Sequence, residues 1–151
     1  MKALITALFL FGTLSANQAL AASEPLKEAT LYKNPECGCC TGYANYLQDN
    51  GYKITVVPTD YMAMVKQSQG ITDDMASCHT MIIDGYAVEG HVPVGIVDKL
   101  LAEHPNISGI YLPGMPMGSP GMSGPKEEPF KVYPFTKGKE VSTTDEPFAV
   151  E

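Results

Sequence analysis

Residues 37–40 read Cys-Gly-Cys-Cys, and residues 78–79 read Cys-His; these two places hold all four cysteines of the chain. An apolar, strand-like stretch at 29–32 precedes the first place. A predicted helix at 41–49, ended by the Asn-Gly pair at 50–51, follows it. The cysteines are therefore expected at a strand-to-helix junction, a unit that favours the α/β class.

Three thiols within four residues favour chemistry over ordinary structural bonding. A helix N-terminus stabilises anions, which lowers the pKa of nearby thiols and favours the thiolates that attack disulfides or bind metals. Cys37 and Cys40 form a Cys-x-x-Cys pair, the pattern of thioredoxin-like redox sites. Cys39 and Cys78 add two further soft donors, and four sulfur ligands suit Cu(I) or Zn(II) better than hard cations.

The first 21 residues are typical of a secretory signal. Lys2 precedes an apolar run at 3–14, and the Ala-Leu-Ala triplet at 19–21 forms a small-x-small cleavage site. The apolar run is shorter than the roughly 20 residues that a spanning helix needs, and we find no second candidate downstream. We therefore predict a signal peptide at 1–21, one exported domain at 22–151 and no membrane span.

Two structural disulfides are the alternative use of four cysteines in an oxidising compartment. A bridge between the adjacent Cys39 and Cys40 would be strained, and the loop from Cys37 to Cys39 is tighter than disulfide geometry favours. Only a disulfide between Cys37 and Cys40 fits the usual geometry, so the second disulfide would have to join Cys39 to Cys78. This alternative stays open beside the metal site.

The charge balance argues against several classes of partner. The chain has 17 acidic residues against 10 basic ones, for a formal net charge of −7, and its sequence contains no arginine. Because forked arginine donors and a positive field are missing, we predict no nucleic-acid or phosphate partner. The sequence also lacks a Ser-His-acid arrangement, a phosphate-binding loop and a His-Glu-x-x-His motif. We therefore assign no catalytic residue and no organic cofactor.

The middle of the chain predicts alternating strands and helices. Asp84-Gly85 is a strong two-residue hairpin signal, and Pro93 fits the first turn of a helix. The remaining predicted elements are strands at 52–57, 80–83, 86–92 and 107–112, and helices between 60 and 70 and from 93 to 103. This order is thioredoxin-like, with a central mixed β-sheet flanked by helices.

The last third of the chain has a different composition. Residues 113–125 contain four prolines, four glycines and three methionines, which predicts a loop. We predict a small hairpin from 130–135 and 140–141 around Gly138, and a frayed end from Asp145. Four methionines outside this loop lie in periodic segments and are predicted to be core residues: Met62, Met64, Met75 and Met81.

Four motifs together resemble one known family. They are Cys-Gly-Cys-Cys at 37–40, Ser-Cys-His-Thr at 77–80, Glu-Gly-His-Val-Pro at 89–93 and Pro-Gly-Met-Pro-Met-Gly-Ser-Pro-Gly-Met at 113–122. In this combination the chain resembles the CopG-type periplasmic copper-resistance proteins, a metal-binding family, over nearly its whole mature length. The resemblance implies a thioredoxin-like fold, a periplasmic location, copper bound by the cysteines and a role in copper tolerance.

Two histidines and three methionines are weaker candidates for the site. His79 adjoins Cys78, but neighbours on a strand point to opposite faces, so we expect only one of them to face the site. His91, at a strand end, either supports the metal or bonds to the backbone. The loop methionines offer thioethers, which are soft donors for Cu(I), or form a lid that shields the thiolates from water: Met115, Met117 and Met122.

The sequence thus predicts an exported copper-binding protein that holds Cu(I), as a thiolate-bridged cluster of several ions, with Cys37, Cys39, Cys40 and Cys78. The expected partners are copper ions and other periplasmic copper-handling proteins. One alternative is a thiol-disulfide oxidoreductase, with Cys37 as attacking thiolate and Cys40 as resolving thiol. The others are a tetrahedral structural zinc site and a copper redox enzyme that cycles Cu(I) and Cu(II).

Overall fold

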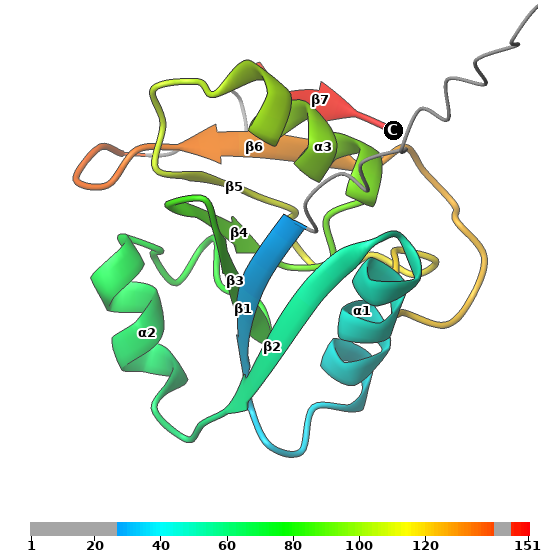
Figure 1. Cartoon of the computed structure of the whole chain (residues 1–151). Helices are drawn as coiled ribbons and strands as arrows, with labels where there is room; N and C mark the ends of the chain where they lie inside the picture. Colours follow the sequence, from blue (N-terminus) through cyan, green and yellow to red (C-terminus); the bar gives the residue numbers. More distant parts are fainter. Residues whose placement is uncertain (1–26, 141–145) are drawn as a thin grey trace, which may run out of the picture.

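A computed structural model describes residues 27–140 and 146–151, and in this part of the chain a mixed seven-stranded sheet is flanked by three helices (Figure 1). The predicted signal peptide at 1–21 lies outside the described residues. The elements are β1 (Lys27–Lys33), α1 (Gly38–Asp49), β2 (Tyr52–Pro58), α2 (Met62–Gln69), β3 (His79–Ile83), β4 (Tyr86–Glu89), α3 (Val94–Glu103), β5 (Gly109–Tyr111), β6 (Lys131–Phe135) and β7 (Ala149–Val150).

The strands lie in the order β2-β1-β3-β4-β5-β6-β7. The pairs β1–β2 and β4–β5 are parallel, and the other neighbours are antiparallel. Asp84 and Gly85 join β3 to β4 with φ angles of 48° and 80°, as a type I′ hairpin turn requires. These findings confirm the predicted α/β class and mixed sheet, and they are compatible with a thioredoxin-like domain.

Helices α1 and α3 cover one face of the sheet (Figure 1). Tyr43 and Leu47 of α1, and Val97 and Leu100 of α3, are fully buried in the larger hydrophobic core. They pack with the inward-facing residues of the strands, among them the predicted core residue Met81. Burial of large side chains of this kind stabilises the fold by roughly 1.5–3 kcal/mol each relative to exposure.

Helix α2 lies on the opposite side of β1 and β3 from α1 (Figure 1). Its eight residues include none that is buried, so the predicted core position of Met64, which is 67% exposed, is wrong. The segment after α2 supplies the apolar contacts on this face instead. Ile71 and the predicted core residue Met75 pack there against Tyr111 and Phe135.

The predicted loop at 113–125 consists of turns and irregular backbone, as expected from its prolines and glycines. Strand β6 follows it and pairs with β5 on one side and with β7 on the other. Phe130 and Glu151 extend the second pairing through two backbone hydrogen bonds of 2.7 and 3.0 Å. The prediction of a frayed end is therefore wrong for 146–151, and Val141 of the predicted hairpin lies outside the described residues.

Among the described residues, none of the helices combines the length and the apolar character needed to cross a membrane.

Candidate metal centre

The four cysteines converge at one edge of the sheet, and their Sγ atoms all lie within 4.8 Å of one another. The pairing of β1 with β3 explains this, because Lys33 at the end of β1 lies opposite His79 at the start of β3. The turn after Lys33 carries Cys37, the N-cap of α1, with Cys39 and Cys40 in the first helical turn. Cys78 immediately precedes β3, so antiparallel pairing brings it to the same edge.

Two of the cysteines are bonded and two are free. Cys37 and Cys40 form a disulfide, the pairing that the spacing favours, whereas Cys39 and Cys78 are free thiols. The Sγ of Cys37 lies 3.5 Å from the Sγ of Cys39 and also accepts a hydrogen bond of 3.3 Å from the backbone N–H of Cys40. Donors at a helix N-terminus stabilise sulfur that carries negative charge. The start of α1 is thus suited to thiolates once the disulfide is reduced.

The protonation of Cys78 depends on its surroundings. Burial raises the pKa of the Cys78 thiol, and the neighbouring Cys39 raises it further through its charge and a hydrogen bond. The charge of Lys66 lowers the pKa and that of Glu89 raises it, and the pKa remains above its ordinary value. Binding of a soft metal would displace this proton, because the thiolate is the ligand form.

Cys37, Cys39 and Cys78 line a solvent-accessible cavity of about 490 Å³, and Cys40 is buried behind it. Asn34, Glu36, Ser77 and Met62 of α2 also line it. The prediction that Met62 belongs to the core is therefore wrong. A topological signal was available: β1 and β2 are parallel, so the residues that follow them, which include Cys37 and Met62, emerge at the same edge.

Met115 is the loop methionine that the structure brings to the cysteines. Its Sδ lies 3.2 Å from the Sγ of Cys78, and its backbone has a positive φ of 46°. Two glycines bring the loop close to α1. A Cβ on Gly121 would lie 2.4 Å from the backbone nitrogen of Tyr43, and one on Gly42 would lie 3.1 Å from the carbonyl oxygen of Gly121. Only glycine permits this approach of the two backbones.

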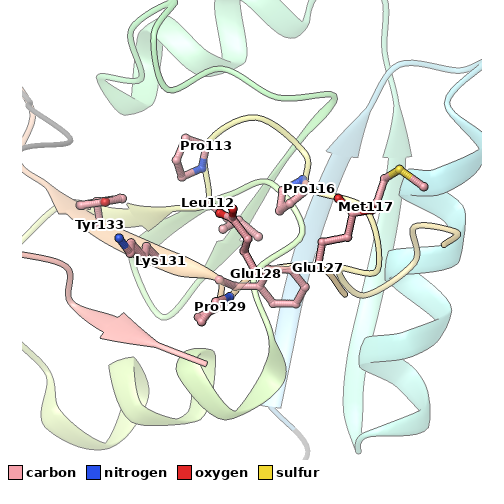
Figure 2. Close-up of a pocket in the computed structure, with 10 residues that line it drawn as sticks. Leu112, Pro113, Pro116, Met117, Glu127, Glu128, Pro129, Lys131 and Tyr133 are labelled. Carbon is pink, nitrogen blue, oxygen red and sulfur yellow. The ribbon is translucent and has the colours of Figure 1, made fainter. Parts of the chain in front are cut away.

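Met117 and Met122 are placed differently. Met117 is 52% exposed and lines a second pocket of about 500 Å³, together with Pro116, Glu127 and Tyr133. Figure 2 shows Met117 beside Pro116 and Glu127 at one side of that pocket, and the four cysteines are not part of its lining. Met122 is half-buried, and its backbone N–H donates to the carbonyl oxygen of Ser119 at 2.8 Å.

His79 and His91 are fully buried on the α1 face of the sheet, against Tyr43. Their rings lie 4.9 Å apart in an edge-to-face arrangement. Nε2 of His79 donates to the Gly90 carbonyl at 3.1 Å, and Nδ1 of His91 donates to the Pro120 carbonyl at 2.6 Å. The other nitrogen of each ring is buried without a hydrogen-bond partner among the described residues.

The environment of both imidazoles favours their neutral form. Burial, the nearby His91 and Lys66 lower the pKa of His79 to about 3, although its bond to Gly90 opposes the shift. Burial also lowers the pKa of His91. Of the adjacent pair, Cys78 lines the cysteine cavity, whereas His79 packs on Tyr43 and is not part of that lining.

An α/β domain that gathers four cysteine sulfurs beside a helix start has the donor set of a metal-binding thiol protein. The donors fit a soft ion, because the four cysteine sulfurs lie within 4.8 Å of one another and the Met115 thioether lies 3.2 Å from the Cys78 sulfur. The family described as "Protein of unknown function, DUF411" matches residues 75–122. A search of curated proteins finds no match.

Two solved structures are similar to nearly the whole described chain. "Copper resistance protein copG- Form 2" has 35% identity and a TM-score of 0.74, and the match covers 84% of this chain and 99% of that one. "Copper resistance protein copG- Form 1" has 37% identity and a TM-score of 0.73, with 85% and 98% covered. The chain therefore belongs to the CopG family of copper-resistance proteins, as the four motifs predict.

Proposed function

We propose that this protein acts in copper resistance by holding Cu(I) between Cys37, Cys39, Cys40 and Cys78. The observation that carries this proposal is the convergence of four sulfurs, from two separate segments, within 4.8 Å. Similarity to structures named as copper-resistance proteins supports copper over other soft metals. The predicted signal peptide supports action in the periplasm, alongside other copper-handling proteins.

Copper loading would begin with reduction of the Cys37–Cys40 disulfide. An external dithiol supplies two electrons and two protons, is itself oxidised to a disulfide, and leaves four cysteine thiols. Each Cu(I) ion that binds then displaces protons from these thiols. We propose a cluster of several ions, because bridging sulfurs satisfy more than one Cu(I) and spread the negative charge of four crowded thiolates.

The candidate ligands outside the cysteines take different roles in this proposal. Met115 is the thioether ligand, because its sulfur already contacts Cys78. Met117 and Met122 belong to the loop that covers the site. His79 and His91 support the site from the core, where their backbone bonds fix the rings. We further propose that these sulfur and histidine groups support a copper redox function, in which an external electron acceptor takes one electron from each Cu(I) to give Cu(II).

Anaerobic copper titration of the reduced protein tests the proposal. We expect more than one Cu(I) per chain, with near-ultraviolet absorption from copper–thiolate bonds and loss of thiol labelling. A single ion would contradict the cluster, and unchanged thiol labelling would contradict copper binding at the cysteines. Zinc is the matched comparison, because a structural zinc site would take one ion and give no such absorption.

A thiol-disulfide oxidoreductase is the second candidate, and the Cys37–Cys40 disulfide at the start of α1 favours it. In this reaction Cys37 attacks a substrate disulfide as thiolate, one substrate sulfur leaves as thiol, and Cys40 then resolves the mixed disulfide. Turnover in a metal-free disulfide-reduction assay would support it. Absence of turnover, together with copper loading, would support copper binding alone.

A further inference from the structure

Glu89, at the end of β4, is a fully buried carboxylate with partners on three segments. Its Oε1 accepts hydrogen bonds from the Lys66 ammonium and from the backbone N–H of Ser77, the latter at 2.5 Å. Its Oε2 accepts from the Thr80 hydroxyl at 2.6 Å. Lys66 also donates to the Thr80 hydroxyl at 3.1 Å. A buried charge is tolerated only when it is paired and hydrogen-bonded in this way.

The position of this network connects it with the cysteine cavity. Ser77 is the residue immediately before Cys78, and its backbone N–H points to Glu89. The Ser77 hydroxyl donates to the carbonyl oxygen of His79, the residue immediately after Cys78, at 3.1 Å. The short segment that presents Cys78 is thus held at both ends, and Glu89 supplies the charged acceptor.

A gain in stability does not by itself explain why a buried ion pair is present here. Well-packed apolar residues in place of a buried pair are often neutral or stabilising, because removing two charges from water costs more than their attraction returns. The side chain of Lys66 is 12% exposed and comes from α2, which buries none of its own residues. The pair therefore spans from an exposed helix to the segment beside Cys78 rather than filling the core.

We propose that Glu89, neutralised by Lys66, is a positioning residue that fixes Cys78 in the cysteine cavity through the Ser77 backbone. The hydrogen bonds of Glu89 go to Lys66, Ser77 and Thr80, and its influence on the Cys78 thiol is through the Ser77 backbone and through its charge. Its consequence for copper retention rests on the proposed function, whereas its effect on Cys78 itself does not. Sequence reasoning had no local signal for it, because Lys66 and Glu89 are distant in the chain and meet only across the sheet.

Alkylation of the metal-free protein, with the Cys37–Cys40 disulfide intact, tests the proposal. Only Cys39 and Cys78 then react, and peptide mass spectrometry gives their separate rates. The pH–rate profile of each cysteine gives its thiolate fraction, so that a change in the pKa of Cys78 is separated from a change in its position. In Glu89→Leu we expect the Cys78 thiolate to react about fivefold faster relative to the Cys39 thiolate, the factor that corresponds to one lost hydrogen bond. An unchanged ratio, or an equal rise at both cysteines, would overturn the proposal.

Glu89→Gln guards against a variant that fails to fold. The amide keeps an acceptor for the Ser77 N–H, but the bond loses its charge assistance, which roughly halves its strength. We expect the Cys78-to-Cys39 ratio to rise about twofold, from the same bond energies. If Glu89→Leu does not fold, this ratio decides the question. Asp98→Asn, which removes a charge from the ion pair between α3 and Lys27 at the start of β1, is the matched control with an unchanged ratio.

A copper arm separates the two proposals. Reduced, copper-loaded Glu89→Gln should release copper to a chelator faster than the wild-type protein does. Failure of the wild-type protein to bind copper would refute the proposed function and leave the labelling result standing. If Glu89→Gln labels faster at Cys78 but retains copper as well as the wild-type protein does, Glu89 positions Cys78 only in the metal-free protein. This result would overturn the predicted effect of Glu89 on copper retention.

Discussion

The Sδ of Met115 lies 3.2 Å from the Sγ of Cys78, and this contact between two sulfur atoms joins the loop at 113–125 to the cysteine cavity. Met115 adopts a positive φ, an uncommon conformation for a residue with a side chain. The surrounding loop holds it there by close contact with α1 at Gly121. The thioether is thus placed at the cavity by the loop backbone.

Met115→Leu should lower copper affinity about tenfold, a loss typical of a disturbed metal site. Leucine conserves volume and hydrophobicity, so the fold should be retained. Met117→Leu is the matched control, because Met117 lines the second pocket, and its copper affinity should equal that of the wild type. Competition with a Cu(I) chelator measures all three affinities. Equal affinity for both variants would remove Met115 from the ligand set and leave it as part of a lid.

Gly121→Ala should detach the loop from α1. The new Cβ would meet the Tyr43 backbone nitrogen at 2.4 Å, and the residue would keep a φ of +81°. Gly138→Ala shares the φ of +81° but meets no atom within 4 Å. It should lose only about 1–2 kcal/mol of stability, the penalty of a left-handed backbone. Urea unfolding of both variants separates the penalty of the positive φ from the clash with α1. Equal losses of stability in the two variants would show that the loop does not depend on its close approach to α1.

The ion pair between Asp98 of α3 and Lys27 at the start of β1 predicts a pH dependence of stability. Burial raises the pKa of Asp98, but hydrogen bonds from Lys27 and Tyr52 and the charge of Lys27 together hold it below its usual value. A carboxyl with a lowered folded pKa stabilises the protein above its unfolded pKa of about 4, and this contribution is lost as the pH falls through the folded pKa.

Asp98→Asn should therefore lower the free energy of unfolding at pH 7 by less than about 1 kcal/mol, because the pair is half exposed. The difference from the wild type should shrink as the pH falls below about 4. Denaturant unfolding at several pH values measures it. Glu28→Gln, in the more exposed pair with Lys53, should show a smaller effect at every pH. If the difference in the free energy of unfolding between Asp98→Asn and the wild type persists at low pH, it arises from packing and not from the charge of Asp98.

Local patterns predicted most of the elements between residues 29 and 112. Turn residues such as Asp84-Gly85, and strands and helices with regular apolar spacing, are encoded within a few residues of chain. Local patterns do not predict β7, the strand that pairs with the outer side of β6. Ala149 pairs with Val132 through contacts between distant parts of the sequence, and the acidic composition of the chain end concealed that strand.

The cysteine site was predictable because its residue types are rare and their spacing is constrained. The exposure of α2 could not be predicted, because apolar spacing identifies a helix but does not show whether another element covers it. Met62 was consequently assigned to the core, although it lines the cysteine cavity. The Lys66–Glu89 pair was also missed, since a lysine and a glutamate 23 residues apart carry no signal until the sheet forms.

Cys78→Ser separates the copper and oxidoreductase functions. Cys78 is the sulfur donor that a separate segment brings to the cysteines of α1, and serine keeps its shape but offers a hard oxygen. We expect lower copper loading and at least about tenfold faster loss to a chelator, since loss of a ligand should exceed the effect of a supporting residue.

The fold and the thiol exchange of this variant provide the internal controls. Circular dichroism should be unchanged, because the Cys78 side chain lies at the cavity rather than in the hydrophobic core. Any disulfide exchange by Cys37 and Cys40 should also persist, since that pair contains both the attacking and the resolving sulfur. Wild-type copper loading and retention in Cys78→Ser would show that Cys78 is not a ligand, and the site would then reduce to the three cysteines at the start of α1.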